Sequence, residues 1–85
     1  MKIIAKNIEV VAWFDISGKP HPVRFKVRDD KDYVIRIDRV VKLDKERIAG
    51  NDMLIFTCQS IIGGSERLYE IKYEICTCKW ILFKF

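Results

Sequence analysis

The segment MLIFTCQSIIGGSERLYEIKYEI, residues 53–75, constrains the fold more than any other part of the chain. Two runs rich in β-branched and aromatic residues flank Gly63-Gly64, and a two-residue turn needs positive φ at both central positions, which glycine adopts freely. The register that follows pairs Cys58 with Tyr69, Phe56 with Ile71, Leu54 with Tyr73, Thr57 with Glu70, and Ile55 with Lys72. One face is then apolar or aromatic and the other mostly polar, so the segment predicts an antiparallel hairpin.

The same alternation recurs along the chain and predicts an all-β fold. The expected strands are Ile8–Phe14, Val23–Arg28, Tyr33–Leu43, Met53–Ser60, Arg67–Cys76 and Lys79–Phe85. Asp44–Ala49 is the one helical candidate, although a bent strand or a single turn fits so short a segment equally. We expect one domain, residues 1–85, of five or six antiparallel strands in meander order, curled into a small barrel or a strongly bent sheet. A bulge near Asp38–Val41 would let one strand serve two sides.

Composition permits several partners and selects none. The 85 residues are 49% apolar and 33% charged, as in folded globular domains, and 16 Lys and Arg against 12 Asp and Glu give a net charge of +4. This charge suits a nucleic acid, an anionic membrane surface or an acidic protein. The first residues lack the continuous apolar segment of a signal peptide, and no apolar run is long enough to cross a bilayer. We therefore expect a cytoplasmic protein that does not enter membranes.

The segment VRFKVR, residues 23–28, places its basic side chains on one face of a strand. For the apolar face of the next strand to coincide with that of the first, the intervening loop must hold an odd number of residues. A three-residue loop places Arg36 opposite either Arg24 or Lys26. Like charges directly across a ladder are unfavourable by a few tenths to about 1 kcal/mol.

This basic stripe, defined as Arg24, Lys26, Arg28 and Arg36, has two interpretations. It is either an ordinary solvated face or an anion-binding surface whose repulsion a phosphate or an acidic side chain relieves. If the stripe binds duplex DNA through four phosphates, the slope of log affinity against log salt is expected to be about −3 to −4. The nearby Asp29, Asp30 and Asp32 can neutralise one end.

Residues around the first turn extend the nucleic-acid hypothesis. Strand parity places Trp13 on the outside, where a base can stack on an exposed ring, although a tryptophan in so small a domain usually belongs to the core. Lys19 and His21 of the adjacent loop would lie at the rim of the stripe. The predicted nucleic-acid-binding residues are therefore Arg24, Lys26, Arg28, Arg36, Lys19 and Trp13.

The last strand supports a different hypothesis. Trp80–Phe85 is apolar on both faces, so it is either sandwiched inside the fold or an exposed edge for a protein partner or a second copy. A protein-interaction module of this kind would bind as well or better in salt, whereas nucleic-acid binding would weaken steeply.

No catalytic or cofactor motif is recognisable, and we expect a non-enzymatic module without cofactors. Cys58, Cys76, Cys78 and His21 are four candidate zinc ligands, but a C-x-C spacing alone is a weak zinc signal. The odd number of cysteines leaves at least one free thiol. We expect the chain to fold without a metal and without a disulfide.

The layout VVAWFDISGKPHPVRF, then YVIRIDRVVK, then CTCKWILFKF resembles that of small conserved bacterial β-domain proteins of unknown function. The residues that carry the resemblance are Trp13, Asp15, Gly18, Pro20, Phe25, Trp80 and Leu82. These positions are structural rather than catalytic. The resemblance therefore implies a small β fold and transfers no functional residues.

Overall fold

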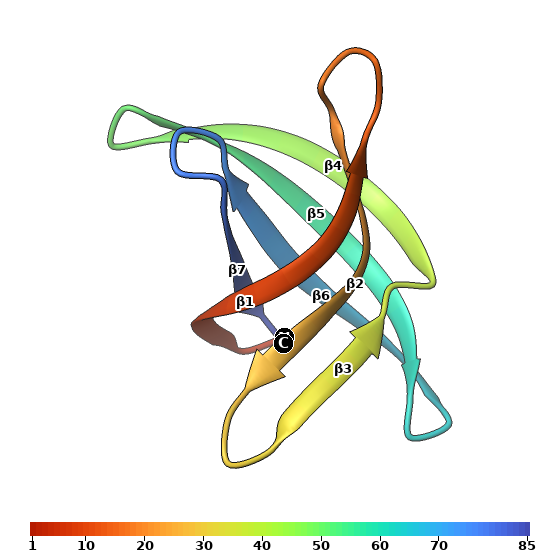
Figure 1. Cartoon of the computed structure of the whole chain (residues 1–85). Coiled ribbons are helices and arrows are strands. Elements are labelled where there is room, and N and C mark those ends of the chain that lie inside the picture. The colour runs from red at the N-terminus through yellow and green to blue at the C-terminus, as the bar shows by residue number, and fades with distance from the viewer.

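The computed structural model describes residues 1–85 as one antiparallel sheet of seven strands (Figure 1). The strands are β1 (Ile3–Phe14), β2 (Pro20–Arg28), β3 (Asp32–Arg36), β4 (Arg39–Ile48), β5 (Asn51–Ile62), β6 (Ser65–Glu74) and β7 (Lys79–Lys84). The all-β prediction is confirmed, but the sheet has seven strands rather than five or six. No helix of a length and hydropathy suited to crossing a bilayer is present.

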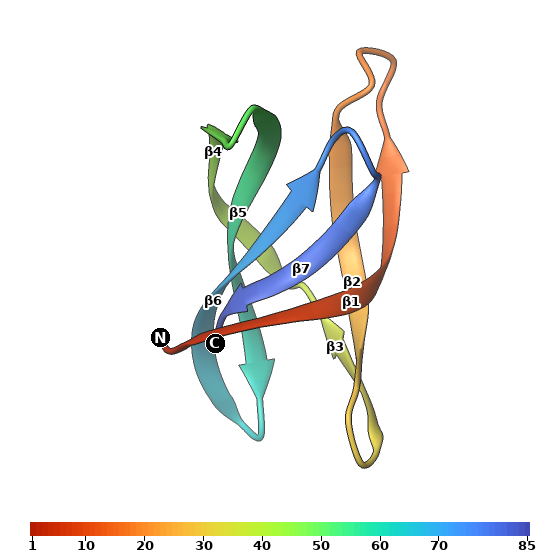
Figure 2. The same ribbon diagram turned by 90° about the vertical axis from the view of Figure 1, so that its left-hand side faces the viewer.

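The sheet order is β3-β2-β1-β7-β6-β5-β4. It is a meander in which the first strand of the chain, β1, pairs with the last strand of the chain, β7 (Figure 2). The sheet is strongly bent but does not close into a barrel, since β3 and β4 remain its two edges. Strand β7 lies between β1 and β6 and is hydrogen-bonded to both. Of the two alternatives for Trp80–Phe85, the strand sandwiched inside the fold is therefore confirmed, and the exposed edge is wrong, because β7 has no free backbone edge to offer another chain.

The predicted strand Tyr33–Leu43 is divided between the two edges of the sheet. Its first part, β3, pairs with β2, and its second part, β4, pairs with β5. Between them the chain crosses over: the Ile37 amide donates to Val23 O at 2.9 Å, and the Asp38 amide donates to Gln59 O at 3.0 Å. A register shift follows between Val40 and Lys42, which overlaps the segment where a bulge was predicted.

The helical candidate Asp44–Ala49 is instead the end of β4 and its turn. The strand continues to Ile48, and Ala49 and Gly50 form a two-residue turn with φ values of 50° and 83°. Positive φ at both central residues matches the twist of the two strands, which explains why a tight hairpin forms here. Every predicted pair of the β5–β6 hairpin is confirmed, with Gly63 and Gly64 in its turn.

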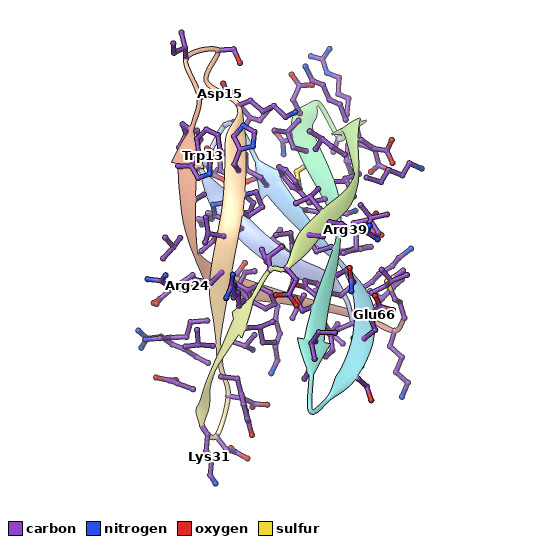
Figure 3. The ribbon with its side chains drawn as sticks, turned by 90° about the vertical axis from the view of Figure 1, so that its right-hand side faces the viewer. Trp13, Asp15, Arg24, Lys31, Arg39 and Glu66 are labelled. Atoms are coloured by element: carbon purple, nitrogen blue, oxygen red, sulfur yellow. The ribbon has the colours of Figure 1, made fainter.

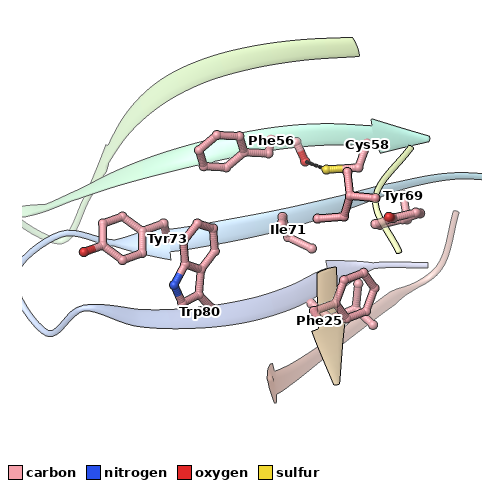
Figure 4. Close-up of a cluster of buried hydrophobic side chains, with 9 residues drawn as sticks. Phe25, Phe56, Cys58, Tyr69, Ile71, Tyr73 and Trp80 are labelled. Atoms are coloured by element: carbon pink, nitrogen blue, oxygen red, sulfur yellow. Dashed lines mark hydrogen bonds between the residues drawn. The ribbon is translucent and has the colours of Figure 1, made fainter. Parts of the chain in front are cut away.

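The core lies inside the bend of the sheet and is rich in aromatic residues (Figure 4). Its buried members come mainly from β5, β6 and β7, joined by one side chain of β2 and one from the crossover: Phe25, Ile37, Phe56, Cys58, Tyr69, Ile71, Tyr73, Trp80 and Leu82. At one end the buried Ser60 hydroxyl lies 2.6 Å from the Tyr69 hydroxyl and donates to Arg36 O at 2.6 Å. This polar contact ties β3 to β5 without strand pairing.

Candidate nucleic-acid interface

The β2–β3 hairpin brings two arginines of the basic stripe together. The loop holds three residues, Asp29–Lys31, and the register places Arg24 directly opposite Arg36, which confirms one of the two predicted pairings. The Ile37 amide donates to Val23 O, so Val23 and Ile37 form a hydrogen-bonded pair. Because the two kinds of pair alternate along an antiparallel ladder, Arg24 and Arg36 form a non-hydrogen-bonded pair. Residues in such pairs have closer Cα atoms and side chains. The Arg24–Arg36 repulsion is therefore built into the hairpin register.

Carboxylates neutralise the stripe unevenly. Three of its members approach an acidic side chain: Arg28 lies 2.9 Å from Glu9, Arg36 Nε lies 3.9 Å from Asp38, and Lys26 Nζ lies 4.0 Å from Asp32. Arg24 makes no ion pair, and the Arg36 side chain is 85% exposed with only its long contact to Asp38. The stripe is thus reduced to two available cations, which face each other.

Trp13 lies on the same outer face of the sheet. A register shift between Val11 and Ala12 places Trp13 opposite His21, and their rings stack with centroids 3.9 Å apart and planes 9° apart. The predicted outward parity of Trp13 is confirmed, because the neighbouring Phe14 packs against the core ring of Tyr73 on the opposite face. The Trp13 side chain is 56% exposed, and with His21 it also lines a hollow between β2 and β4. Val11, one step along the face, pairs with Arg24. Figure 3 shows Trp13 and Arg24 on one side of the molecule, away from Arg39 and Glu66.

Asp15 organises the turn that carries Trp13 and His21. Its carboxylate lies 3.0 Å from His21 Nε2 and accepts bonds from the Ser17 hydroxyl at 2.6 Å and the Lys19 amide at 3.0 Å. The contact with His21, followed by those with Ser17 and Lys19, lowers the pKa of Asp15 well below its ordinary value. The turn therefore holds the imidazole against the indole, while Lys19 is exposed beside the hollow between β2 and β4.

The face also has a shallow hollow beside the arginines. It measures about 300 Å³ and is formed by β1, β2 and β3, with Val11, Arg24, Lys26 and Val34 among its lining residues. Glu9 also lines it, and its carboxylate is neutralised by Arg28 at 2.9 Å. Exposed apolar and cationic groups therefore alternate over a concave surface, which suits a ligand that is itself partly flat and partly anionic.

The candidate zinc ligands are dispersed. Cys58 is fully buried in the core, where burial raises the pKa of its thiol to about 12, and its Sγ points to Phe56 O (Figure 4). Cys76 and Cys78 are exposed in the β6–β7 loop, and His21 is held by Asp15. No three His, Cys, Asp or Glu side chains are grouped so that they could hold a metal ion.

Comparison of the chain with protein-family models, curated proteins and solved structures finds no match.

Proposed function

We propose that this protein is a small non-enzymatic module that binds single-stranded nucleic acid on the outer face of β1, β2 and β3. One observation carries the proposal: an exposed indole ring and two facing arginines lie on the same sheet face, at neighbouring register positions. Trp13 pairs with His21, and Val11, two residues before it, pairs with Arg24. Arg36 lies directly across from Arg24 on β3.

The two parts of the face supply the two interactions that a single strand needs. A base stacking on an aromatic ring contributes about 1–3 kcal/mol, and this works for any base. One phosphate on Arg24 and a second on Arg36 would convert a repulsive pair into two charge-assisted contacts. The stacked His21 stiffens Trp13, so less side-chain freedom is lost when a base binds.

A single strand fits this face better than a duplex does. Bases of a duplex are stacked on one another and cannot reach an indole on a sheet surface, whereas unpaired bases can be splayed onto it. The reduced number of available cations also matters. Two phosphates neutralised on a single strand give a slope of log affinity against log salt of about −1.4, much less than the duplex value expected for the whole stripe.

Fluorescence anisotropy of a dye-labelled oligothymidine at several salt concentrations tests the proposal. The double variant Arg24→Gln/Arg36→Gln should lose most of the salt dependence and bind more weakly. The control Lys45→Gln/Arg47→Gln removes the same charge from β4 and should bind like the parent. Trp13→Ala should weaken binding about fivefold or more at every salt concentration. Equal losses in both double variants, or no binding by the parent, would refute the proposal.

A further inference from the structure

The opening between the two edges of the sheet is divided into two clefts by the crossover at Ile37 and Asp38. The first, here called the β4 cleft, measures about 420 Å³ and lies between β2 and β4. Its β2 wall contains Pro20 and Pro22, which have no N–H to donate, and β4 is dense in charged side chains. Prolines and charges are the usual protections of a sheet edge, so this cleft is closed to strand addition.

The second, the β3 cleft, measures about 500 Å³ and has a mainly apolar lining. It lies between β3 and the last residues of β5, and the end of β7 forms its floor. Its apolar lining includes Val27, Tyr33, Ile35, Ile62, Leu82 and Phe85. Tyr33 remains 54% exposed although it shares the inward parity of Ile35, because no strand covers it. An interior surface of the sheet is therefore open to solvent here.

The edge of β3 beside this cleft has unpaired backbone groups. Arg36 O accepts a bond from the Ser60 hydroxyl, so the backbone of Arg36 points away from β2. Because hydrogen-bonding direction alternates along a strand, the N–H and C=O of Val34 point the same way, and no strand lies there to pair with them. The charges of β3 lie only at its two ends, Asp32 and Arg36, and neither a proline nor a bulge interrupts it. Val34, at its centre, is 62% exposed.

The facing edge of β5 is, in contrast, already protected. Strand β4 pairs with β5 only as far as Gln59, so Ile61 lies beyond its end. The Ile61 amide nevertheless donates to Asp38 Oδ2 at 2.8 Å, and the carboxylate takes the place of a strand partner. Of the two edges that border the β3 cleft, only β3 can accept another strand.

We propose that the edge of β3 binds an extended peptide of about five residues by strand addition. The backbone of the peptide pairs with Val34, and its side chains at alternate positions enter the β3 cleft against Tyr33 and Ile35, as the two-residue period of a strand requires. The residue between them lies opposite Val34, with its side chain on the outer face diagonal to Arg36 and to Asp32. We take it to be acidic, because Lys26 already approaches Asp32 at 4.0 Å, whereas the Arg36 guanidinium is mostly exposed and only weakly paired. The partner is therefore a segment with alternating apolar residues and one acidic residue among them.

A synthetic heptapeptide with blocked ends, valine at alternate positions, and one glutamate and threonines between them tests the proposal. Titrated into the ¹⁵N-labelled protein, it should shift the amides of β3 and slow hydrogen exchange at Val34. Replacing the glutamate by lysine should weaken binding about threefold, as expected for one exposed charge contact. The same peptide N-methylated at its pairing amides should not bind.

Two protein variants complete the test. Val34→Pro removes the outward N–H, a substitution that an edge strand tolerates, and should reduce binding at least tenfold with the rest of the spectrum unchanged. Val34→Ala keeps the N–H and should bind like the parent. If the Val34→Pro variant does not fold, the N-methylated peptide still tests strand addition on the unaltered protein, because it should not bind.

Other occupants of the cleft would overturn the proposal. No peptide binding, or equal binding of the N-methylated peptide, would exclude strand addition. Binding of the apolar dye anilinonaphthalene sulfonate without peptide binding would make the cleft a small-molecule site. Concentration-dependent shifts of β3 without any peptide would make its occupant a second copy of the chain.

Discussion

Basic side chains on the outer face of β4–β7 differ from those on the outer face of β1–β3 in their burial and in the partners of their charges. Lys72, on β6, is only 7% exposed and pairs with Ile55 on one side and Ile81 on the other. Its ammonium lies 3.6 Å from the centroid of the Phe83 ring and 3.9 Å from Glu46. Arg36, on β3, is almost wholly exposed and faces another arginine.

The difference separates structural cations from available ones. The stem of Lys72 covers apolar surface, and its charge is satisfied within the molecule. Arg24 and Arg36 cover little, and their mutual repulsion leaves a site that an anion would stabilise. Lys72, Arg24 and Arg36 contribute equally to the net charge. Their neighbours make Lys72 a structural residue and leave Arg24 and Arg36 available to a ligand.

Replacing Lys72 should have the largest effect. Lys72→Ala is expected to lower the free energy of unfolding by about 2 kcal/mol, because it exposes Ile55 and removes the contact with Phe83. Lys72→Met, which keeps the apolar stem, should cost about half as much. Arg36→Ala, the matched change on the other half, should cost less than about 0.5 kcal/mol. Urea unfolding measures all three changes in stability. Similar losses for Lys72→Ala and Arg36→Ala would contradict the distinction between structural and available cations.

The contact that joins the two halves gives the next effect. Ser60→Ala removes the hydroxyl that bonds both Arg36 O and the Tyr69 hydroxyl. Leaving buried polar partners unsatisfied should cost about 1–3 kcal/mol in urea unfolding. The double variant Ser60→Ala/Tyr69→Phe leaves fewer partners unsatisfied and should cost less than the sum of the two single changes. Strict additivity would mean that the two hydroxyls act independently.

The core thiol should make stability fall in alkali. Burial raises the pKa of Cys58 to about 12, so the unfolded chain loses this proton at lower pH than the folded one does. The stabilisation is therefore complete below the ordinary thiol pKa and is lost as pH rises toward 12. Between pH 8 and pH 10 the contribution of Cys58 should fall by about 1 kcal/mol. The loss should be smaller in Cys58→Val, and equal losses in both proteins would contradict the burial argument.

Relief of the arginine repulsion should give the smallest effect. Arg24→Gln is expected to raise the free energy of unfolding by a few tenths of a kcal/mol at low salt, and the gain should disappear at high salt. Lys45→Gln, on β4, should give no such gain. Thermal unfolding at two salt concentrations measures both. Destabilisation by Arg24→Gln at low salt would mean that the pair is held by contacts other than repulsion.

The parts of the fold that could be predicted depend on glycine turns and clean alternation. Gly63 and Gly64 set the register of β5 and β6, and the odd loop after Arg28 set that of β2 and β3. Strand β4 was ambiguous because an edge strand carries charges on both faces and loses the alternation. Its turn was missed because Ala49 adopts positive φ, which the residue type does not indicate.

The candidate site was predictable only in part, for a related reason. The facing arginines follow from one hairpin, so local pattern was sufficient. The pairing of Arg28 with Glu9 and the stacking of Trp13 on His21 both depend on the register of β1 with β2. A bulge at Val23 of β2, which has no partner between the Val11–Arg24 and Ala12–Pro22 pairs, shifts that register, and no turn residue in the sequence indicates it.

NMR mapping of oligothymidine binding tests the central claim most directly, because it reports on both halves of the sheet at once. Titration of the ¹⁵N-labelled protein should shift the indole N–H of Trp13 and the amides around Arg24 and Arg36, while amides around Lys72 on β6 stay unchanged. Shifts confined to this face of β1–β3 are the predicted result. Shifts centred on β4–β7, or no shifts at all, would contradict the assignment of this face as the binding surface.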